Sequence, residues 1–154
     1  MYKLLNIAYM HKKELFKGIF YYFLFFFVIT LDQLIKHRLR SSGGVYVCNQ
    51  GISFGITISS YFYWIFFAFF FLLSLYLIFK KNALFKTFFV IGLILIFAGA
   101  ISNASDKFLF NCILDYIYIF SGVFPIFNIA DIAISTGSTL IILSLLNKNN
   151  NNCV

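Results

Sequence analysis

Charge is scarce in this chain of 154 residues: charged side chains make up 11% of the sequence and hydrophobic ones 62%. A soluble domain carries about 25% charged and about 45–50% apolar residues, so this composition argues against a soluble fold and indicates a membrane protein. There is one proline, and the only two histidines, His11 and His37, fall at the flanks of a predicted helix. No Ser/His/Asp set and no zinc-binding motif is visible, so we expect neither a metal nor another cofactor.

Cysteine is also sparse, and its pattern indicates no metal site or disulfide framework. Cys48, Cys112 and Cys153 are odd in number and irregularly spaced. Cys48 and Cys112 would both face the outer compartment and could pair there, but free, apolar cysteines are favoured. Bulky Val47 precedes Cys48 where a lipid-attachment box requires a small residue, so we reject that interpretation.

Long runs without charge are abundant, and they predict four transmembrane helices. The uncharged windows are 18–31, 61–79, 87–105 and 132–146. The middle two match the ~20 residues that span a bilayer core, and each outer one must extend past a polar residue to reach that length. The predicted helices therefore run over about 18–39, 61–79, 87–105 and 127–146. We expect one membrane-embedded domain, 1–154, of all-α class with a small extracytoplasmic β-sheet.

The sheet is predicted in two outer segments, 41–60 and 106–125. In the first, β-branched and aromatic residues flank Asn49-Gln-Gly51, which predicts a strand, a turn and a second strand. Asn49 can either adopt the positive φ of such a turn or contact a substrate. The second outer segment is apolar and β-prone, and we expect it to complete the sheet. Residues 1–17 are polar and basic and are expected to form a short cytoplasmic leader rather than a cleaved signal sequence.

The net charge of +7 is better explained by membrane orientation than by nucleic-acid binding. With the amino terminus in the cytoplasm, more basic residues lie inside than outside, as the positive-inside rule requires. Glu14 is the only acid on the inner side. The other acids all fall on the outer side: Asp32, Asp106, Asp115 and Asp131. The pattern predicts both termini in the cytoplasm and a polar site at the outer face.

Two of these acids suggest chemistry. Asp131 lies where the last helix begins, and a charge at membrane depth is a functional-site hypothesis by default. The segment between Asp115 and Asp131 contains Pro125 and can fold back, which would bring the two carboxyl groups together. Two carboxylates in a partly dry site share one proton, giving the acid and base of aspartic proteolysis. Asp32 and Lys36 stand four apart on one helix face and would form or support a polar site.

Five motifs in this order resemble those of the lipoprotein signal peptidases (signal peptidase II). They are Asp32-Gln-Leu-Ile-Lys36, Asn49-Gln-Gly-Ile-Ser-Phe-Gly55, Gly99-Ala-Ile-Ser-Asn103-Ala-Ser-Asp106, then Asp115, and Phe127-Asn-Ile-Ala-Asp131. The resemblance extends from the first predicted helix to the last. It implies four transmembrane helices with a small outer sheet. It also implies an enzyme that cuts the signal peptide from a prolipoprotein just before the diacylglyceryl-modified cysteine.

The resemblance also implies roles for individual residues. Asp115 and Asp131 would be the catalytic pair. The positions that would shape or support the site are Asp32, Lys36, Asn49, Gly51, Asn103, Asp106 and Asn128. Two departures are visible: Lys107 stands where the family usually has arginine, and Ser53 where it usually has alanine. The expected partners are the lipidated prolipoprotein and membrane lipids, with no nucleic acid. The expected setting is a monomer in the bacterial cytoplasmic (inner) membrane, with its site at the outer leaflet.

Two other function classes deserve weight. A small proton-coupled transporter also needs membrane carboxylates, but it would carry acids deep in several helices, whereas the two middle windows have none. A non-enzymatic membrane scaffold would use polar residues only for helix packing, which leaves Asp115, in a loop, without a purpose. The motif set favours the peptidase.

Overall fold

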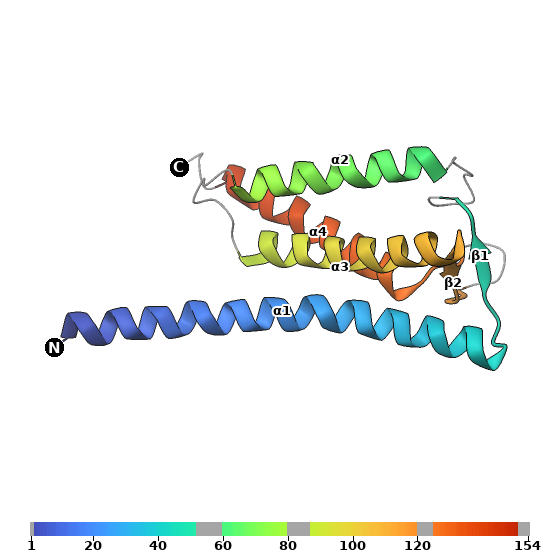
Figure 1. Ribbon diagram of the computed structural model, residues 1–154. Helices are drawn as coiled ribbons and strands as arrows, with labels where there is room; N and C mark the ends of the chain where they lie inside the picture. Colours follow the sequence, from blue (N-terminus) through green and yellow to red (C-terminus); the bar gives the residue numbers. More distant parts are fainter. Residues whose placement is uncertain (1, 52–59, 80–86, 120–124, 151–154) are drawn as a thin grey trace.

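The computed structural model describes residues 2–51, 60–79, 87–119 and 125–150, which form helices and two short strands. In chain order these are α1 (Tyr2–Ser42), β1 (Val47–Asn49), α2 (Ser60–Phe79), α3 (Thr87–Phe110), β2 (Ile113–Asp115) and α4 (Ile129–Asn150). The helices extend along a common direction and the strands lie together at one end (Figure 1). The start of α1 and the end of α4 lie at the other end. Four helices and a small sheet are therefore present in the described residues.

α1 corrects the prediction of a separate leader, because it begins at Tyr2 rather than near residue 18. The prediction was wrong because it placed the helix start where charge ends, although lysine and glutamate are good helix formers. Glu14 and Lys17, one turn apart, even form an ion pair of 2.8 Å. The helix ends in a Schellman motif, in which Gly43 has a φ of 70° and Gly44 N donates to Leu39 O over 3.0 Å.

Other helix boundaries also differ from the prediction, and α1 and α4 end at Ser42 and Asn150 rather than near residues 39 and 146. α3 continues to Phe110, so Asp106 and Lys107 are helical and do not belong to an outer loop. Asn111, with a φ of 57°, ends this helix. α4 begins at Ile129, because Phe127 is occupied in an isolated antiparallel bridge with Ile117. α2 starts within one residue of its predicted bound.

β1 and β2 form a two-stranded antiparallel sheet. Val47 pairs with Asp115, Cys48 with Leu114 and Asn49 with Ile113. The second strand predicted after Asn49-Gln-Gly51 lies outside the described residues.

A disulfide joins Cys48 of β1 to Cys112, which immediately precedes β2, with the two Cα atoms 5.4 Å apart. The expectation of free cysteines at these positions was therefore wrong. The pairing depends on strand register: only once β1 lies antiparallel to β2 do the two residues come within the usual Cα separation of a disulfide.

Close packing of small residues brings α3 and α4 together. A Cβ atom added at Gly92 would lie 2.7 Å from Gly137 O, and one added at Gly99 would clash with Ala130 O. Beside this contact a small apolar core contains Val28, Ala98 and Ala133. Helix association in lipid depends on such small residues, because lipid chains are as apolar as the helix surfaces.

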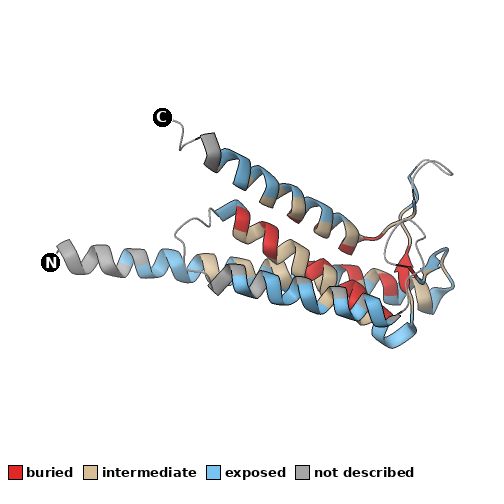
Figure 2. Cartoon of the chain, turned by 90° about the horizontal axis from the view of Figure 1, so that it is seen from above, coloured by how far each residue is buried: buried red, intermediate tan, exposed pale blue. Residues whose placement is uncertain are grey.

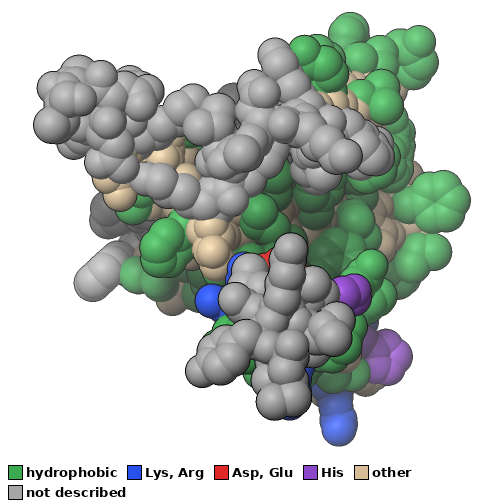
Figure 3. All heavy atoms as spheres, turned by 90° about the vertical axis from the view of Figure 1, so that its left-hand side faces the viewer, with side chains coloured by type: hydrophobic (Ala, Val, Ile, Leu, Met, Phe, Trp, Pro, Cys, Tyr) green, Lys and Arg blue, Asp and Glu red, His purple; other side chains and the backbone are tan. Residues whose placement is uncertain are grey.

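Exposed side chains on the helices are largely hydrophobic, whereas the buried polar and charged side chains gather near the sheet, beside buried Ile113 and Leu114. Figure 2 shows where the buried positions lie, and Figure 3 shows hydrophobic side chains over much of the described surface seen from the end with the termini. This is the polarity expected of helices surrounded by lipid.

Three helical segments in the described residues are long and apolar enough to cross a membrane: His11–Ser42, Thr87–Phe110 and Ile129–Asn147. α2 packs beside α3 through two edge-to-face ring contacts, of Trp64 with Phe108 at 6.3 Å and of Phe71 with Phe97 at 5.6 Å between centroids. The fourth predicted crossing, by α2, stays a prediction.

Candidate active site

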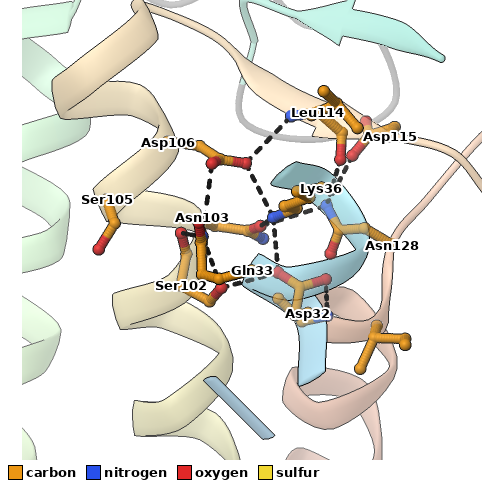
Figure 4. Close-up of polar contacts among 12 residues, drawn as sticks. Asp32, Gln33, Lys36, Ser102, Asn103, Ser105, Asp106, Leu114, Asp115 and Asn128 are labelled. Carbon is orange, nitrogen blue, oxygen red and sulfur yellow. Dashed lines mark hydrogen bonds and ion pairs between the residues drawn. The ribbon is translucent and has the colours of Figure 1, made fainter. Parts of the chain in front are cut away.

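A fully buried lysine lies at the centre of the polar cluster near the sheet. Lys36 Nζ is 2.7 Å from Asp32 Oδ2 and 2.9 Å from Asp106 Oδ2, and it donates to Asn103 Oδ1 over 2.9 Å (Figure 4). The side chains of Lys36, Asp32 and Asp106 are all completely inaccessible. A buried charge is tolerated only when it is paired and fully hydrogen-bonded, and here one cation faces two carboxylates. The predicted pairing of Asp32 with Lys36 is therefore part of a larger network.

Asp32 also links α1 to the other helices. Its Oδ2 accepts a bond of 2.7 Å from Ser102 Oγ on α3. Its Oδ1 accepts bonds of 3.1 Å from the Tyr116 hydroxyl and 3.3 Å from Ala130 N on α4. A carboxylate placed at the first turn of α4 also suits the positive end of that helix. Asp32 thus holds the start of α4 against α1.

Asp106 of α3 links the sheet to α1 and α3. Its Oδ1 is 2.8 Å from Arg40 Nη2, and its Oδ2 accepts a bond of 3.3 Å from Leu114 N of β2. Arg40 also stacks over the ring of Phe110, with its guanidinium carbon 3.7 Å from the centroid. The last two turns of α1, the end of α3 and β2 are therefore joined through one carboxylate.

Asn128 and Asp131 form a reciprocal cap at the start of α4. Asn128 Oδ1 accepts from Asp131 N over 2.9 Å, and Asp131 Oδ2 accepts from Asn128 N over 3.1 Å. This is the capping-box arrangement, with the N-cap residue and the residue three positions later bonding each other's backbone. Asp131 Oδ1 accepts a further bond of 2.8 Å from Asn103 Nδ2, which fixes the carboxylate against α3.

Asp115, at the end of β2, is brought to the same cap. Its Oδ1 accepts a bond of 2.7 Å from Asn128 Nδ2, and its Oδ2 one of 2.9 Å from Asn49 Nδ2. Asn128 therefore bonds both acids that the sequence predicts to meet, Asp115 through its side chain and Asp131 through its backbone.

Burial raises the pKa of Asp115 to about 6, and the neighbouring charge of Asp131 acts in the same direction. The hydrogen bonds from Asn49 and Asn128 and the charge of Lys36 oppose the rise. Burial also raises the pKa of Tyr116, which the nearby carboxylate of Asp32 raises further. Asp115 can therefore exchange a proton near neutral pH, as a general acid or base must.

Asn49 has two contacts at once. It lies in strand conformation, so the alternative of a positive-φ turn position is wrong. Its Oδ1 accepts a bond of 2.9 Å from the backbone of buried Gly51, while its amide nitrogen donates to Asp115. One residue on, Gln50 O accepts a bond of 2.6 Å from Lys107 Nζ on α3. The positive charge at position 107 thus helps to hold the chain that carries Asn49.

All nine residues predicted for the site lie in this network, with Gly51 at its edge. The prediction missed the partners Gln33, Arg40, Ser102 and Tyr116. Arg40 follows Asp32 and Lys36 at the same four-residue spacing, which could have identified it. Gln33 and Ser102 stand within two of the motifs quoted above, which could have identified them, whereas Tyr116 carries no such signal, because its contact depends on how the helices pack. In the described part of the chain, no group of three His, Cys, Asp or Glu residues is arranged to hold a metal ion.

Comparison with known proteins gives a consistent result. The family model for signal peptidase (SPase) II matches residues 24–147. Lipoprotein signal peptidases of Staphylococcus aureus strains JH9 and Newman are each 35% identical over 105 residues, which cover 67% of this chain. The match spans 64% of the length of these relatives.

Two solved structures, each described as a bacterial membrane enzyme, share the fold. One, determined by the in meso method at 2.3 Å resolution, superposes with a TM-score of 0.72 and 28% identity, over 85% of this chain and 90% of the other. The second, at 1.9 Å resolution, gives a TM-score of 0.68 and 29% identity, over 82% and 92%.

Proposed function

The chain belongs to the signal peptidase II family, and from that membership and the geometry of its site we propose that it is an aspartic endopeptidase. Its substrates are prolipoproteins whose cysteine carries a diacylglyceryl group, and it removes their signal peptide by cleaving before that cysteine. Asp115 and Asp131 are the catalytic residues.

The observation that carries this proposal is the attachment of both carboxyl groups to Asn128. Two acids that are bound to the same residue in a partly dry site share one proton, and their titration belongs to the pair. The ionised acid takes a proton from water as the water oxygen attacks the amide carbonyl carbon. The protonated acid then donates its proton to the leaving nitrogen as the carbon–nitrogen bond breaks. No metal is needed for either step.

The remaining site residues support the pair. Lys36 supplies a fixed positive charge that lowers the cost of placing several carboxylates together, and Asp32 and Asp106 hold that charge in place. Asn103 connects Lys36 to Asp131, and Asn49 with Gly51 positions a donor on Asp115.

The setting follows from the polarity of the molecule. The polar site lies at the sheet end, opposite the first residues of α1 and the last of α4, and exposed apolar side chains surround the helices. We place the site at the outer leaflet of a bacterial inner membrane, with both termini in the cytoplasm. All site residues come from one chain, so a monomer suffices.

The decisive experiment compares a diacylated and an unlipidated precursor, each incubated with the purified protein in detergent. Only the diacylated precursor should be cut, before its modified cysteine. Asp115→Asn and Asp131→Asn should each reduce cleavage by at least about a hundredfold, because the proton transfers of general acid–base catalysis are lost. Glu14→Gln makes the same chemical change in an exposed pair with Lys17 and should retain full activity. Full activity in either aspartate variant would end the proposal.

The transporter alternative has less support. The buried charged side chains of the described residues gather near the sheet, while the core between α1, α3 and α4 is formed by Val28, Ala98 and Ala133. A proton path across the membrane would need ionisable groups or water along that core.

A further inference from the structure

The strand that carries Asn49 has little to hold it in place. β1 is three residues long, its Val47 is 42% exposed, and Cys48 is also exposed. A short two-stranded ladder is at best marginally stable in water, so burial and ladder hydrogen bonds alone would leave β1 free to separate from β2. Yet the amide of Asn49 must remain 2.9 Å from Asp115 Oδ2.

The disulfide supplies the missing constraint. Side chains alternate between the two faces of a strand, so the antiparallel register puts Asn49 and Asp115 on one face and Cys48 on the other. Cys112 lies two residues before Leu114, the ladder partner of Cys48, so the covalent link spans the ladder diagonally. It therefore fixes the ladder from the face opposite the acid without occupying the space around Asp115.

On the far side of Asn49, the bond from Lys107 Nζ to Gln50 O holds the next residue. Asn49 is thus held on both sides, covalently through Cys48 to Cys112, which immediately precedes β2, and by a charged hydrogen bond from Lys107 in the last turn of α3 to Gln50.

We propose that the Cys48–Cys112 disulfide is a positioning element of the active site, which holds the amide of Asn49 on the carboxyl group of Asp115. This inference rests on the proposed peptidase function. Neither cysteine touches the reacting atoms; both act through Asn49.

Reduction should therefore change the chemistry of Asp115. A dithiol such as dithiothreitol supplies two electrons and two protons, the sulfur–sulfur bond breaks, and two thiols remain while the reductant becomes a cyclic disulfide. Cys48 is exposed, so the bond is open to the reductant. Once β1 loosens, Asp115 loses a donor that lowers its pKa, while Asn128, Lys36 and Asp131 still face it. Its pKa should rise, and the limb of the pH–rate profile that follows its ionisation should move to higher pH.

The test uses the full-length protein in detergent with a diacylated precursor. Cys48→Ser/Cys112→Ser removes the link, Cys153→Ser is the matched control for loss of a cysteine, and Asn49→Ala removes the positioned donor. The double cysteine variant should lose about tenfold in kcat, the worth of one hydrogen bond to a charged group, with KM little changed and the pH profile shifted upward. Cys153→Ser should match the wild type.

The effects on kcat of Asn49→Ala and of removing the disulfide should not be additive. With Asn49 already replaced by alanine, removing the disulfide should cost less than about twofold, because the donor that it positions is gone. A full additional tenfold loss would show that the disulfide acts elsewhere, and an unchanged rate and pH profile in Cys48→Ser/Cys112→Ser would equally overturn the proposal. Alkylation of all three cysteines in unreduced wild-type protein would also overturn the proposal, because it would show that the disulfide is absent. Reduction of folded wild-type protein should reproduce the variant, which excludes a failure of the serine protein to fold.

Hydrogen exchange separates this inference from the proposed function. Backbone amides of β1 and β2 should exchange faster in the double cysteine variant, and those in the middle of α3 should not. If the wild type cut neither precursor, the proposed function would fail. The positioning role has its own test: equal exchange rates of the β1 and β2 amides with and without the disulfide would reject it.

Discussion

At the scale of single residues, Asn128 has the largest number of roles in the site. Its side-chain oxygen caps α4, while its side-chain nitrogen donates to Asp115 and, at 3.2 Å, to Asn103 Oδ1. Its backbone nitrogen binds Asp131. Capping requires an acceptor, whereas holding Asp115 requires a donor, and an amide carries the two on separate atoms, so that it can do both at once.

These two roles can be separated by substitution. Asn128→Ser keeps an oxygen that can cap α4 but loses the donor to Asp115, and Asn128→Ala loses both. We expect kcat to fall by about 10–100-fold in both variants, from the loss of a hydrogen bond to a charged group. Thermal unfolding should be near the wild-type midpoint for serine, whereas alanine should lose about 1 kcal/mol of stability from the missing cap. Equal destabilisation by serine and alanine would contradict the capping role, and full activity in the serine variant would contradict the positioning role.

The raised pKa of Asp115 should also appear in the stability of the protein. Its pKa is about 6 in the folded state, against about 3.9 for an unfolded aspartate. The folded state therefore binds the proton more tightly, so stability from this group is fully present below pH 4 and is lost as the pH rises to about 6. Asp115→Asn has no such dependence. The unfolding midpoint of Asp115→Asn minus that of the wild type should therefore increase between pH 4 and 7. A constant difference would contradict the raised pKa of Asp115 in the folded state.

Asp32, Asp106 and Asp131 could be predicted from the sequence, because each borders an apolar window, and Asp115 because the segment around Pro125 can fold back and the motif set includes it. Their partners could be predicted only in part. Asn103 and Asn128 were identified because they belong to motifs, whereas the contact of Tyr116 with Asp32 spans 84 positions and is set by helix packing. A local sequence pattern contains no information on a contact of that range.

At the scale of elements, the helix boundaries that were predicted are those that a local sequence pattern marks. The absence of charge identifies where a helix enters lipid, and α2, which lies almost wholly within such a window, was predicted to within one residue. α1 and α3 continue beyond their windows, because backbone hydrogen bonding does not stop where lipid does. The strand register and the disulfide that depends on it could not be derived from composition.

Helix packing connects to the site through Gly99. A Cβ atom there would clash with Ala130 O and lie 2.8 Å from Ile134 Cγ1, and Ala130 is next to Asp131 in the first turn of α4. We expect Gly99→Ala to push this turn outward, costing about 1–3 kcal/mol of stability by overpacking and lowering kcat as Asp131 moves.

Gly18→Ala is the matched control. It makes the same change within α1, where nothing lies within 4 Å of the added atom, and should stabilise the helix by up to about 1 kcal/mol. Unfolding midpoints and cleavage rates of the two variants check this prediction. An unaltered rate in Gly99→Ala would mean that α4 does not depend on this contact for its position.

At the scale of the whole molecule, the path of the chain bears on how often it crosses the membrane. α1 and α3 both end near the sheet, and the chain must return to the opposite end between them (Figure 1). α2 is the element that lies along this return. Its 20 residues rise about 30 Å at 1.5 Å each, which matches the bilayer core. Its ring contacts with α3 extend from Phe108, near the sheet, to Phe97, about three turns away.

If α2 crosses the membrane, the number of crossings is even and both termini lie on the same side. We therefore expect a peptide tag at either terminus to resist protease added to intact spheroplasts, and both tags to be digested once the membrane is permeabilised. A tag inserted between Gly43 and Gly44, at the turn after α1, should be digested without permeabilisation, because that turn lies at the sheet end of the molecule. Digestion of only one terminal tag would require an odd number of crossings. Since α1 and α3 both run toward the sheet, that result would contradict the arrangement that delivers Asp32, Asp106 and Asp131 to one end.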